Sequence, residues 1–199
     1  MTSRKMRDAQ IGLDGMVPST TLEANKRLLL LPLIGHSAPQ RDVIFEPTPM
    51  PIVRAMLELA TVGPPDVVYD LGSGDGRIPL TAAKEYGACG VGVESDPALI
   101  AEARANAKQA GLADNVHFIE GNMFEADCSG ATIVTLFLHP EPNRQLRPRL
   151  LAQLTPGARI VSYIWDMGDW QADAAQRLEN RRWMYLWRVP ERPSAPAST

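Results

Sequence analysis

From about residue 45, the chain alternates short apolar runs with segments whose apolar residues recur every three or four positions. Short apolar runs between glycines or prolines are typical of buried strands, and the second pattern is typical of amphipathic helices. The runs predict strands at residues 67–71, 90–93, 116–119, 132–138 and 159–165. Strands that alternate with helices predict an α/β fold with a mostly parallel central sheet.

Three of the predicted helices carry recognisable signals at or near their first residue. The helix before the first strand follows a proline-rich lead-in at residues 46–51, where Thr48 can act as its cap. Asp96 and Pro97 predict the N-cap and the first residue of a later helix. Pro148 is expected to start or kink the last helix, because proline lacks a backbone N–H and obstructs the preceding turn.

The two ends of the chain differ in pattern from its centre. Residues 174–189 alternate around a turn at 179–181, which predicts a two-stranded antiparallel hairpin on the edge of the sheet. We expect an N-terminal arm at residues 1–44, a single domain at 45–189 and a disordered tail at 190–199.

Composition narrows the class of protein. A chain of 199 residues with 45% hydrophobic and 22% charged residues has room for one ordinary soluble domain. The net charge of -3 offers no basic field, so we expect no nucleic acid partner. Cys89 and Cys128 lack metal-ligand spacing, which predicts no metal site, no disulfide framework and a reducing, cytoplasmic location.

The longest aliphatic run, Leu28 to Ile34, is interrupted by Pro32. It falls far short of the roughly 20 residues that a bilayer requires, so no membrane span is expected. We interpret it as an N-terminal packing segment, and docking to a partner is the alternative.

The most informative stretch lies at residues 67–77, where an apolar run ends in Asp70 and passes into Gly72, Gly74 and Gly76. Glycine permits a positive φ and close approach of a ligand to the backbone, and the N–H groups of the following helix point into the same space. Asp70 adds a negative charge there, which indicates a cationic ligand. The G-x-G-x-G spacing departs from the G-x-G-x-x-G of dinucleotide-binding loops. A glycine-rich turn without a ligand is the alternative.

Further candidate residues stand at the ends of the predicted strands, where open α/β sheets bind their ligands. Glu94 ends the second strand and can accept two hydrogen bonds from a ribose diol, although a solvated acid is the alternative. Asn122 and Met123 follow the third strand and can read the edge and cover the face of an adenine; a turn residue is the alternative for Asn122. Thr135 lies late in the fourth strand.

The motif Asp70-x-Gly-x-Gly-x-Gly resembles the first motif of the class I S-adenosylmethionine-dependent methyltransferases. Other segments resemble one branch of that class, and these are Pro47-Thr48-Pro49, Met56-Leu57, residues 68–78 and 134–138, Asn143, Leu146-Arg147-Pro148, Pro156-Gly157, Ile160-Val161-Ser162 and Gly168-Asp169-Trp170. Residues from about Phe45 to Val189 are thereby similar to the small family that holds archaeal protein lysine methyltransferase and the mitochondrial lysine methyltransferases of ATP synthase subunit c and the adenine nucleotide translocase. The resemblance implies a Rossmann-like class I methyltransferase fold.

The resemblance also implies S-adenosyl-L-methionine as cofactor. The residues that would bind it are Thr48, Asp70, Gly72, Ser73, Gly74, Glu94, Asn122, Met123 and Thr135. Within this set, Asp70 would face the ammonium group, Glu94 the ribose and Asn122 the adenine, while Thr48 would close over the methionyl end. The family usually has Asp where Asn122 stands, often Tyr where Phe45 stands and commonly Leu where His139 stands.

The implied reaction is N-methylation of a protein lysine by in-line transfer, for which the enzyme mainly positions the reacting groups. An apolar channel would lower the amine pKa from its ordinary value of about 10.4. Phe45, Phe137 and Trp170 are the candidates for its aromatic wall; Phe137 and Trp170 have core packing as the alternative. His139 is interpreted as a loop histidine without a catalytic role. The alternative functions are a small-molecule methyltransferase and a non-enzymatic binding protein with the same fold.

Overall fold

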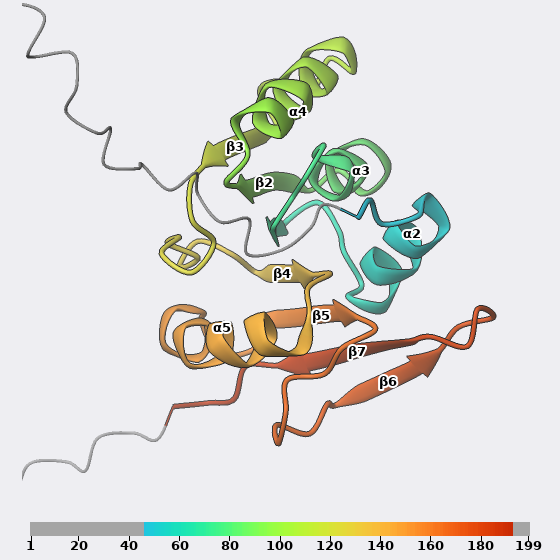
Figure 1. Cartoon of the computed structure of the whole chain (residues 1–199), viewed down its shortest axis with the longest axis vertical. Coiled ribbons are helices and arrows are strands. Elements are labelled where there is room, and N and C mark those ends of the chain that lie inside the picture. Colours follow the sequence, from blue (N-terminus) through green and yellow to red (C-terminus); the bar gives the residue numbers. More distant parts are fainter. Residues whose placement is uncertain (1–45, 193–199) are drawn as a thin grey trace, which may run out of the picture. The chain divides into compact units, whose positions relative to one another are not determined.

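A seven-stranded sheet in the order β3-β2-β1-β4-β5-β7-β6 forms the centre of the computed structural model (Figure 1). The structure describes residues 46–192, so Phe45, the N-terminal arm, the Leu28 to Ile34 run and the tail from residue 193 lie outside the described residues. The strands are β1 (Val67–Leu71), β2 (Cys89–Glu94), β3 (Val116–Glu120), β4 (Ile133–Leu136), β5 (Arg159–Tyr163), β6 (Ala174–Arg177) and β7 (Trp183–Arg188). The helices are α2 (Met50–Leu59), α3 (Arg77–Tyr86), α4 (Pro97–Gln109) and α5 (Pro140–Gln153).

The pairing of the strands confirms the predicted fold class. β1 pairs in parallel with β2 and β4, β2 with β3, and β4 with β5. β7 runs antiparallel to β5 and to β6, which confirms the hairpin predicted at residues 174–189. The strand order reverses between β1 and β4, so the space beyond their carboxyl ends is where such a sheet binds its ligand.

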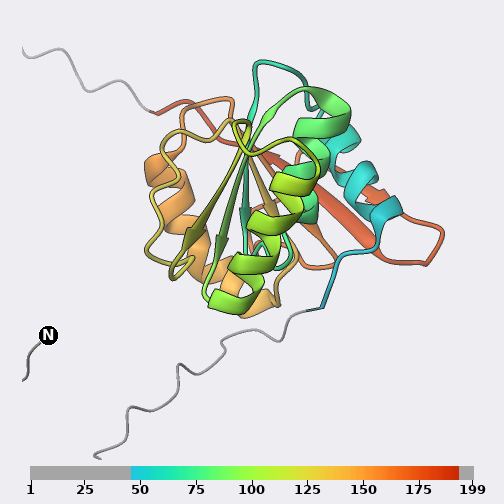
Figure 2. The ribbon, with the colours of Figure 1, turned by 90° about the horizontal axis from the view of Figure 1, so that it is seen from above.

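Helices cover both faces of the sheet, with α2, α3 and α4 on one side and α5 on the other (Figure 2). Val68 and Ile133 direct their side chains into the α2 side, where they pack against Met56 and Leu57. Neighbouring strand positions such as Leu136 pack on the α5 side instead. The alternation follows from the two-residue period of a strand, and it leaves the strands buried on both faces.

One predicted helix cap is wrong, and one of the two roles expected of Pro148 is excluded. The N-cap of α2 is Pro49 rather than Thr48, and no side chain caps this end, because two prolines already fix the backbone of the first turn. α5 begins at Pro140, so Pro148 lies inside the helix instead of starting it. The hydrogen bond that Pro148 cannot donate is outweighed by the burial of the helix face that carries Leu146.

The fifth strand is shorter than predicted. The apolar run continues to Trp165, but β5 ends at Tyr163 because Ile164 adopts a φ of 73°, outside the strand region. The fourth strand likewise covers only Ile133–Leu136 of the predicted 132–138.

A polar network ties together the opposite, amino-terminal ends of β1, β4 and β5. The Asp66 carboxylate accepts hydrogen bonds from the Thr132 hydroxyl at 2.7 Å and the Gly63 N–H at 2.9 Å, and it forms an ion pair with Arg159. Arg159 also donates to the Ala60 carbonyl oxygen at 2.6 Å. The network therefore stabilises the end of the sheet that faces away from the candidate site.

Candidate active site

The glycine-rich loop between β1 and α3 lies beyond the carboxyl end of the central strand. Gly72, Gly74 and Gly76 all have positive φ, at 81°, 52° and 80°. The N–H groups of Gly72 and Ser73 donate to the carbonyl oxygen of Val93 at 2.9 and 3.0 Å. These bonds attach the loop to the neighbouring strand β2, so that it keeps one conformation.

Glu94, at the tip of β2, is bonded to the same loop. One of its carboxylate oxygens accepts the Gly74 N–H at 3.0 Å, and the other accepts the N–H groups of Ser95 and Asp96 at 2.8 and 3.0 Å. The carboxylate is thus fixed between two loops at adjacent strand ends. A partly exposed oxygen pair held in this way is suited to accept hydrogen bonds from a diol.

Asp70 lies one strand further, and its side chain is 4% exposed. The Thr135 hydroxyl donates to its carboxylate at 2.7 Å, since the two residues are register partners in β1 and β4. Burial raises the pKa of Asp70 to about 7; the charges of Glu94 and Asp75 act in the same direction, and the Thr135 hydrogen bond opposes them. An ammonium group beside Asp70 would restore its ionised form.

The Ser73 hydroxyl oxygen is buried and has no hydrogen-bond partner among the described residues. A buried hydroxyl without a partner costs free energy unless a ligand or water satisfies it. Its oxygen lies against β2, because a Cβ at Gly92 would be 2.6 Å from it. The glycine loop and the buried Asp70 carboxylate therefore fit a ligand with a cationic end.

Gly76, the third glycine, has a packing role. A Cβ at this position would lie 2.4 Å from the ring of Phe118, and a Cβ at Gly92 would lie 2.7 Å from the same ring. The aromatic side chain from β3 thus occupies the space that both missing side chains would need. The glycine spacing serves the packing of α3 and β3 as well as the ligand.

A second contact ties the predicted lead-in to the glycine loop. Arg77, the first residue of α3, forms an ion pair with Asp75 at 2.5 Å and donates to the carbonyl oxygen of Thr48 at 2.9 Å. Thr48 itself is 5% exposed. The segment before α2 is therefore held beside the loop, as the predicted role of Thr48 requires.

The residues predicted to meet an adenine are less firmly held. Asn122 is exposed, and its side-chain oxygen accepts the Phe124 N–H at 2.9 Å, which makes it a turn residue in this structure. Met123 is half-buried, and its sulfur would lie 3.9 Å from a Cβ at Gly72. Met123 is thus brought next to the loop, while the Asn122 amide group faces Glu125 at 3.4 Å.

The predicted aromatic residues lie in different surroundings. Phe137 directly follows β4 and packs at a tilted angle against Tyr163, with ring centroids 5.0 Å apart. Trp170 packs instead against Trp187, at 6.0 Å, and under the guanidinium of Arg147, at 5.8 Å. Phe137 therefore stands at the carboxyl end of the sheet, while Trp170 belongs to the packing between α5 and β7.

A buried pair at this end of the sheet had no predicted role. Asn143 and Ser162 are both fully buried, and the Asn143 amide nitrogen lies 3.1 Å from the Ser162 hydroxyl. Both donate to the carbonyl oxygen of Trp165, at 3.2 and 2.6 Å. The two positions appear among the motifs of the family resemblance, which was the available signal.

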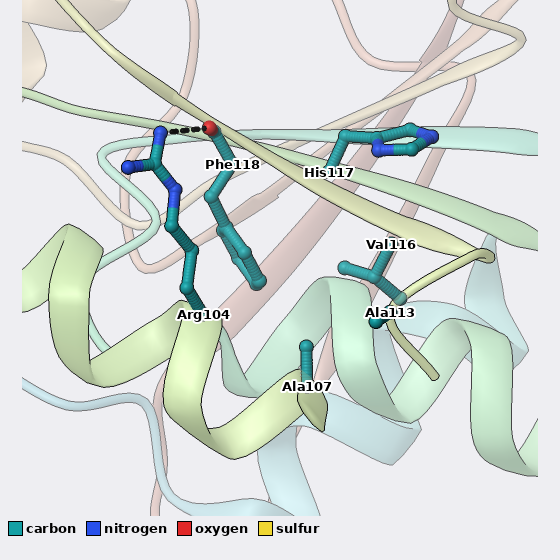
Figure 3. A pocket seen from close by; sticks show the side chains of 6 residues that line it. All are labelled: Arg104, Ala107, Ala113, Val116, His117 and Phe118. Carbon is teal, nitrogen blue, oxygen red and sulfur yellow. Dashed lines mark hydrogen bonds between the residues drawn. The ribbon is translucent and has the colours of Figure 1, made fainter. Parts of the chain in front are cut away.

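Other features of the described residues lie away from this site. A hollow of about 260 Å³ between α4 and β3 is lined by Val116 and His117, and across it Arg104 donates to the Phe118 carbonyl at 2.9 Å (Figure 3). Within residues 46–192 no group of three or more His, Cys, Asp or Glu side chains is placed to hold a metal ion. No helix in this part of the chain has the length and hydropathy needed to cross a bilayer.

Comparison with known proteins gives consistent matches. A family model described as the ANTKMT methyltransferase domain matches residues 70–174. A protein-lysine N-methyltransferase of Saccharolobus islandicus is 41% identical over 153 residues, which cover 75% of this chain and 95% of that protein. The adenine nucleotide translocase lysine N-methyltransferase of Mus musculus is 33% identical over 147 residues, and the match spans 72% of this chain but only 57% of the mouse protein.

A solved structure resembles the chain over most of its length. It is described as an RNA methyltransferase from Salinibacter ruber in complex with S-adenosyl-L-homocysteine, and it is 52% identical with a TM-score of 0.72. The match covers 77% of this chain and all of the Salinibacter chain.

The sheet order, the glycine loop and these matches define a class I S-adenosylmethionine-dependent methyltransferase. Within that class, the chain belongs to the family of the ANTKMT methyltransferase domain.

Proposed function

We propose that the site binds S-adenosyl-L-methionine through Asp70, Ser73 and the glycine loop, with Glu94 on the ribose. The observation that carries this proposal is the buried Asp70 carboxylate at the strand end where the glycine loop begins, with its three glycines at positive φ. A bound cofactor supplies an electrophilic methyl group on a positively charged sulfur. Asp70 holds the ammonium end, and Glu94 orients the ribose.

The remaining members of the predicted set contribute position or contact. Thr135 orients the Asp70 carboxylate through its hydrogen bond. Met123 lies next to Gly72 and would cover one side of the adenine. Asn122 would have to release the Phe124 N–H to reach the adenine edge.

The proposed acceptor is a lysine of a protein substrate. It is supported by the Saccharolobus relative, because this chain covers nearly the whole of a protein-lysine N-methyltransferase at 41% identity. The enzyme must hold a neutral amine of the substrate in line with the methyl group. Positioning of this kind lowers the activation barrier by roughly 7–11 kcal/mol. Phe137, half-buried on Tyr163, offers an apolar wall that favours the uncharged amine.

RNA is the second candidate acceptor, because the Salinibacter structure is described as an RNA methyltransferase. An RNA substrate requires lysine and arginine side chains to neutralise its phosphates. This chain has a net charge of -3, and the exposed Asp166 carboxylate, near the carboxyl end of β5, forms no ion pair within the described residues. These charges favour a protein over RNA.

The test uses purified protein, methyl-labelled S-adenosylmethionine, and separate samples of total protein, total RNA and small molecules from one cell extract. Label on a protein, located to lysine by mass spectrometry and absent with Asp70→Asn, is the expected result. Label on RNA alone, or on a small molecule alone, would reject the lysine proposal. Absence of cofactor binding in calorimetry would reject the enzymatic function itself.

A further inference from the structure

Trp165 is an exposed tryptophan at the functional end of the sheet. Residues 46–192 expose three large hydrophobic side chains, Ile119, Trp165 and Trp183, at 46%, 37% and 42%. Trp165 follows the carboxyl end of β5 by two residues, and β5 neighbours β4, which pairs with the strand of Asp70. Trp165 therefore lies at the same end of the sheet as the glycine loop, beyond the carboxyl ends of the parallel strands.

The backbone that carries Trp165 is strained and firmly held. Ile164 has a φ of 73°, which a β-branched residue rarely adopts and which strains the backbone. The buried Asn143 amide donates to the carbonyl oxygens of both Trp165 and Asp166, each at 3.2 Å. Ser162 donates to the first of these at 2.6 Å. Buried hydrogen bonds thus fix the turn while the side chains of Trp165 and Asp166 remain exposed.

A second ring joins Trp165 from the neighbouring strand end. His139, the N-cap residue of α5, is exposed, and its ring centroid lies 6.4 Å from that of Trp165. Its carbonyl oxygen accepts the N–H of Asn143 at 3.3 Å. This is the backbone hydrogen bond of the first helical turn, so the start of α5 positions His139, while the Asn143 side chain on the same helix holds the Trp165 turn.

Charge indicates what these rings bind. The Asp166 side chain is exposed, and its carboxylate accepts only the Gly168 N–H, at 3.0 Å, among the hydrogen bonds of residues 46–192. In the same part of the chain it forms no ion pair, whereas Glu141 pairs with Arg144 and Asp169 with Arg147. An uncompensated carboxylate beside two aromatic rings fits a cationic side chain with an apolar stem, and it repels phosphate.

We propose that Trp165, His139 and Asp166 form the surface that binds the lysine-bearing segment of a protein substrate, with Asn143 and Ser162 as its positioning residues. The inference rests on the proposed function and specifies its substrate class, namely protein segments with basic residues next to the target lysine. Trp170 was one of three aromatic candidates for the acceptor wall, and it packs against Trp187. We assign the contact with the substrate segment to Trp165.

The test uses two synthetic 20-residue peptides with one central lysine, flanked in one by arginines and in the other by glutamates. The variants are Trp165→Ala and Asp166→Asn, and Trp183→Ala is the matched control because its exposure is similar and it stacks on Tyr185 instead. Removing an aromatic anchor typically lowers binding by roughly 10- to 100-fold. We expect kcat/KM for the arginine-flanked peptide to fall by about this factor in Trp165→Ala, mainly through KM.

The other expected results separate substrate binding from folding. Asp166→Asn should lose most of the preference for the arginine-flanked peptide, while Trp183→Ala stays within about twofold of the wild type. Affinity for S-adenosyl-L-homocysteine in calorimetry should be unchanged in all three variants. Lysine methylation by the wild type with no loss in Trp165→Ala or Asp166→Asn would overturn this inference and leave the proposed function standing.

An RNA arm completes the experiment. If the wild type labels neither peptide nor extract protein but labels RNA, both the proposed acceptor and this surface's substrate class are rejected. Labelling of RNA that Trp165→Ala removes would assign the rings to base stacking instead.

Discussion

The buried carboxylate of Asp70 should make the cofactor-free protein less stable as the pH rises. Its pKa is raised from 3.8 to about 7, mainly by burial. Between these two values the folded protein holds a proton that the unfolded chain has released, so the free energy of unfolding falls by about 1.4 kcal/mol per pH unit. The whole change amounts to roughly 4 kcal/mol, and it is complete above about pH 7.

Asp70→Asn removes this titration but keeps the size of the side chain and an acceptor for the Thr135 hydroxyl. Urea unfolding of the cofactor-free variant and wild type, at several values between pH 5 and 8, is the measurement. The variant should gain stability relative to the wild type as the pH rises and keep a constant advantage above about pH 7. Asp114→Asn, an exposed acid after α4, is the control and should show no such trend.

Cofactor affinity should show the opposite dependence. Because the ammonium group of the cofactor pairs with ionised Asp70, the Kd should rise by up to about tenfold for each pH unit below 7, and Asp70→Asn should bind weakly at every pH. A stability difference between Asp70→Asn and wild type that stays flat from pH 5 to 8 would refute the reasoning.

Three further predictions concern the parts around Asp70. Glu94→Gln keeps the shape of the side chain but loses the charge-assisted bonds to Gly74, Ser95 and Asp96. This change should weaken cofactor binding at least tenfold, measured by calorimetry, and lower the free energy of unfolding by about 1–2 kcal/mol, measured in urea. Arg159→Ala leaves Asp66 without its cation and should cost roughly 3–5 kcal/mol in urea unfolding, while the cofactor Kd measured on the folded protein stays the same. Asn143→Ala should lower the free energy of unfolding by about 1–3 kcal/mol and raise KM for the acceptor more than it raises the cofactor Kd. A larger change in the cofactor Kd than in the acceptor KM would contradict the assignment of Asn143 to the Trp165 turn.

The order and type of the strands and helices could be predicted from the sequence, because the local patterns agreed with the final fold at most positions. Apolar runs gave the strands, and Asp96 with Pro97 marked the start of α4 as observed, with the Asp96 side chain accepting the Ala98 N–H. The acid and glycines at the end of β1 were likewise visible, because ligand loops require residue types that stand out in a sequence.

Long-range contacts and irregular backbone conformations could not be predicted from these local patterns. The Asp70–Thr135 contact depends on the register of β1 against β4, which joins residues 65 positions apart. The end of β5 depends on the positive φ of Ile164, and an isoleucine in a sequence does not indicate a positive φ. Asn143 resembles any polar helix residue until the turn that it holds is known. Such features come from tertiary contacts, and local propensity does not encode them.

The ring of Phe118 has a consequence for how this sequence can change over time. It fills the positions that side chains at Gly76 and Gly92 would occupy, with contacts of 2.4 and 2.7 Å to the Cβ atoms that these glycines lack. A larger residue at either glycine is therefore accessible only after Phe118 has become smaller. Related sequences should show the three positions varying together. The glycine motif, usually ascribed to the ligand, would then also depend on the size of one aromatic side chain on β3.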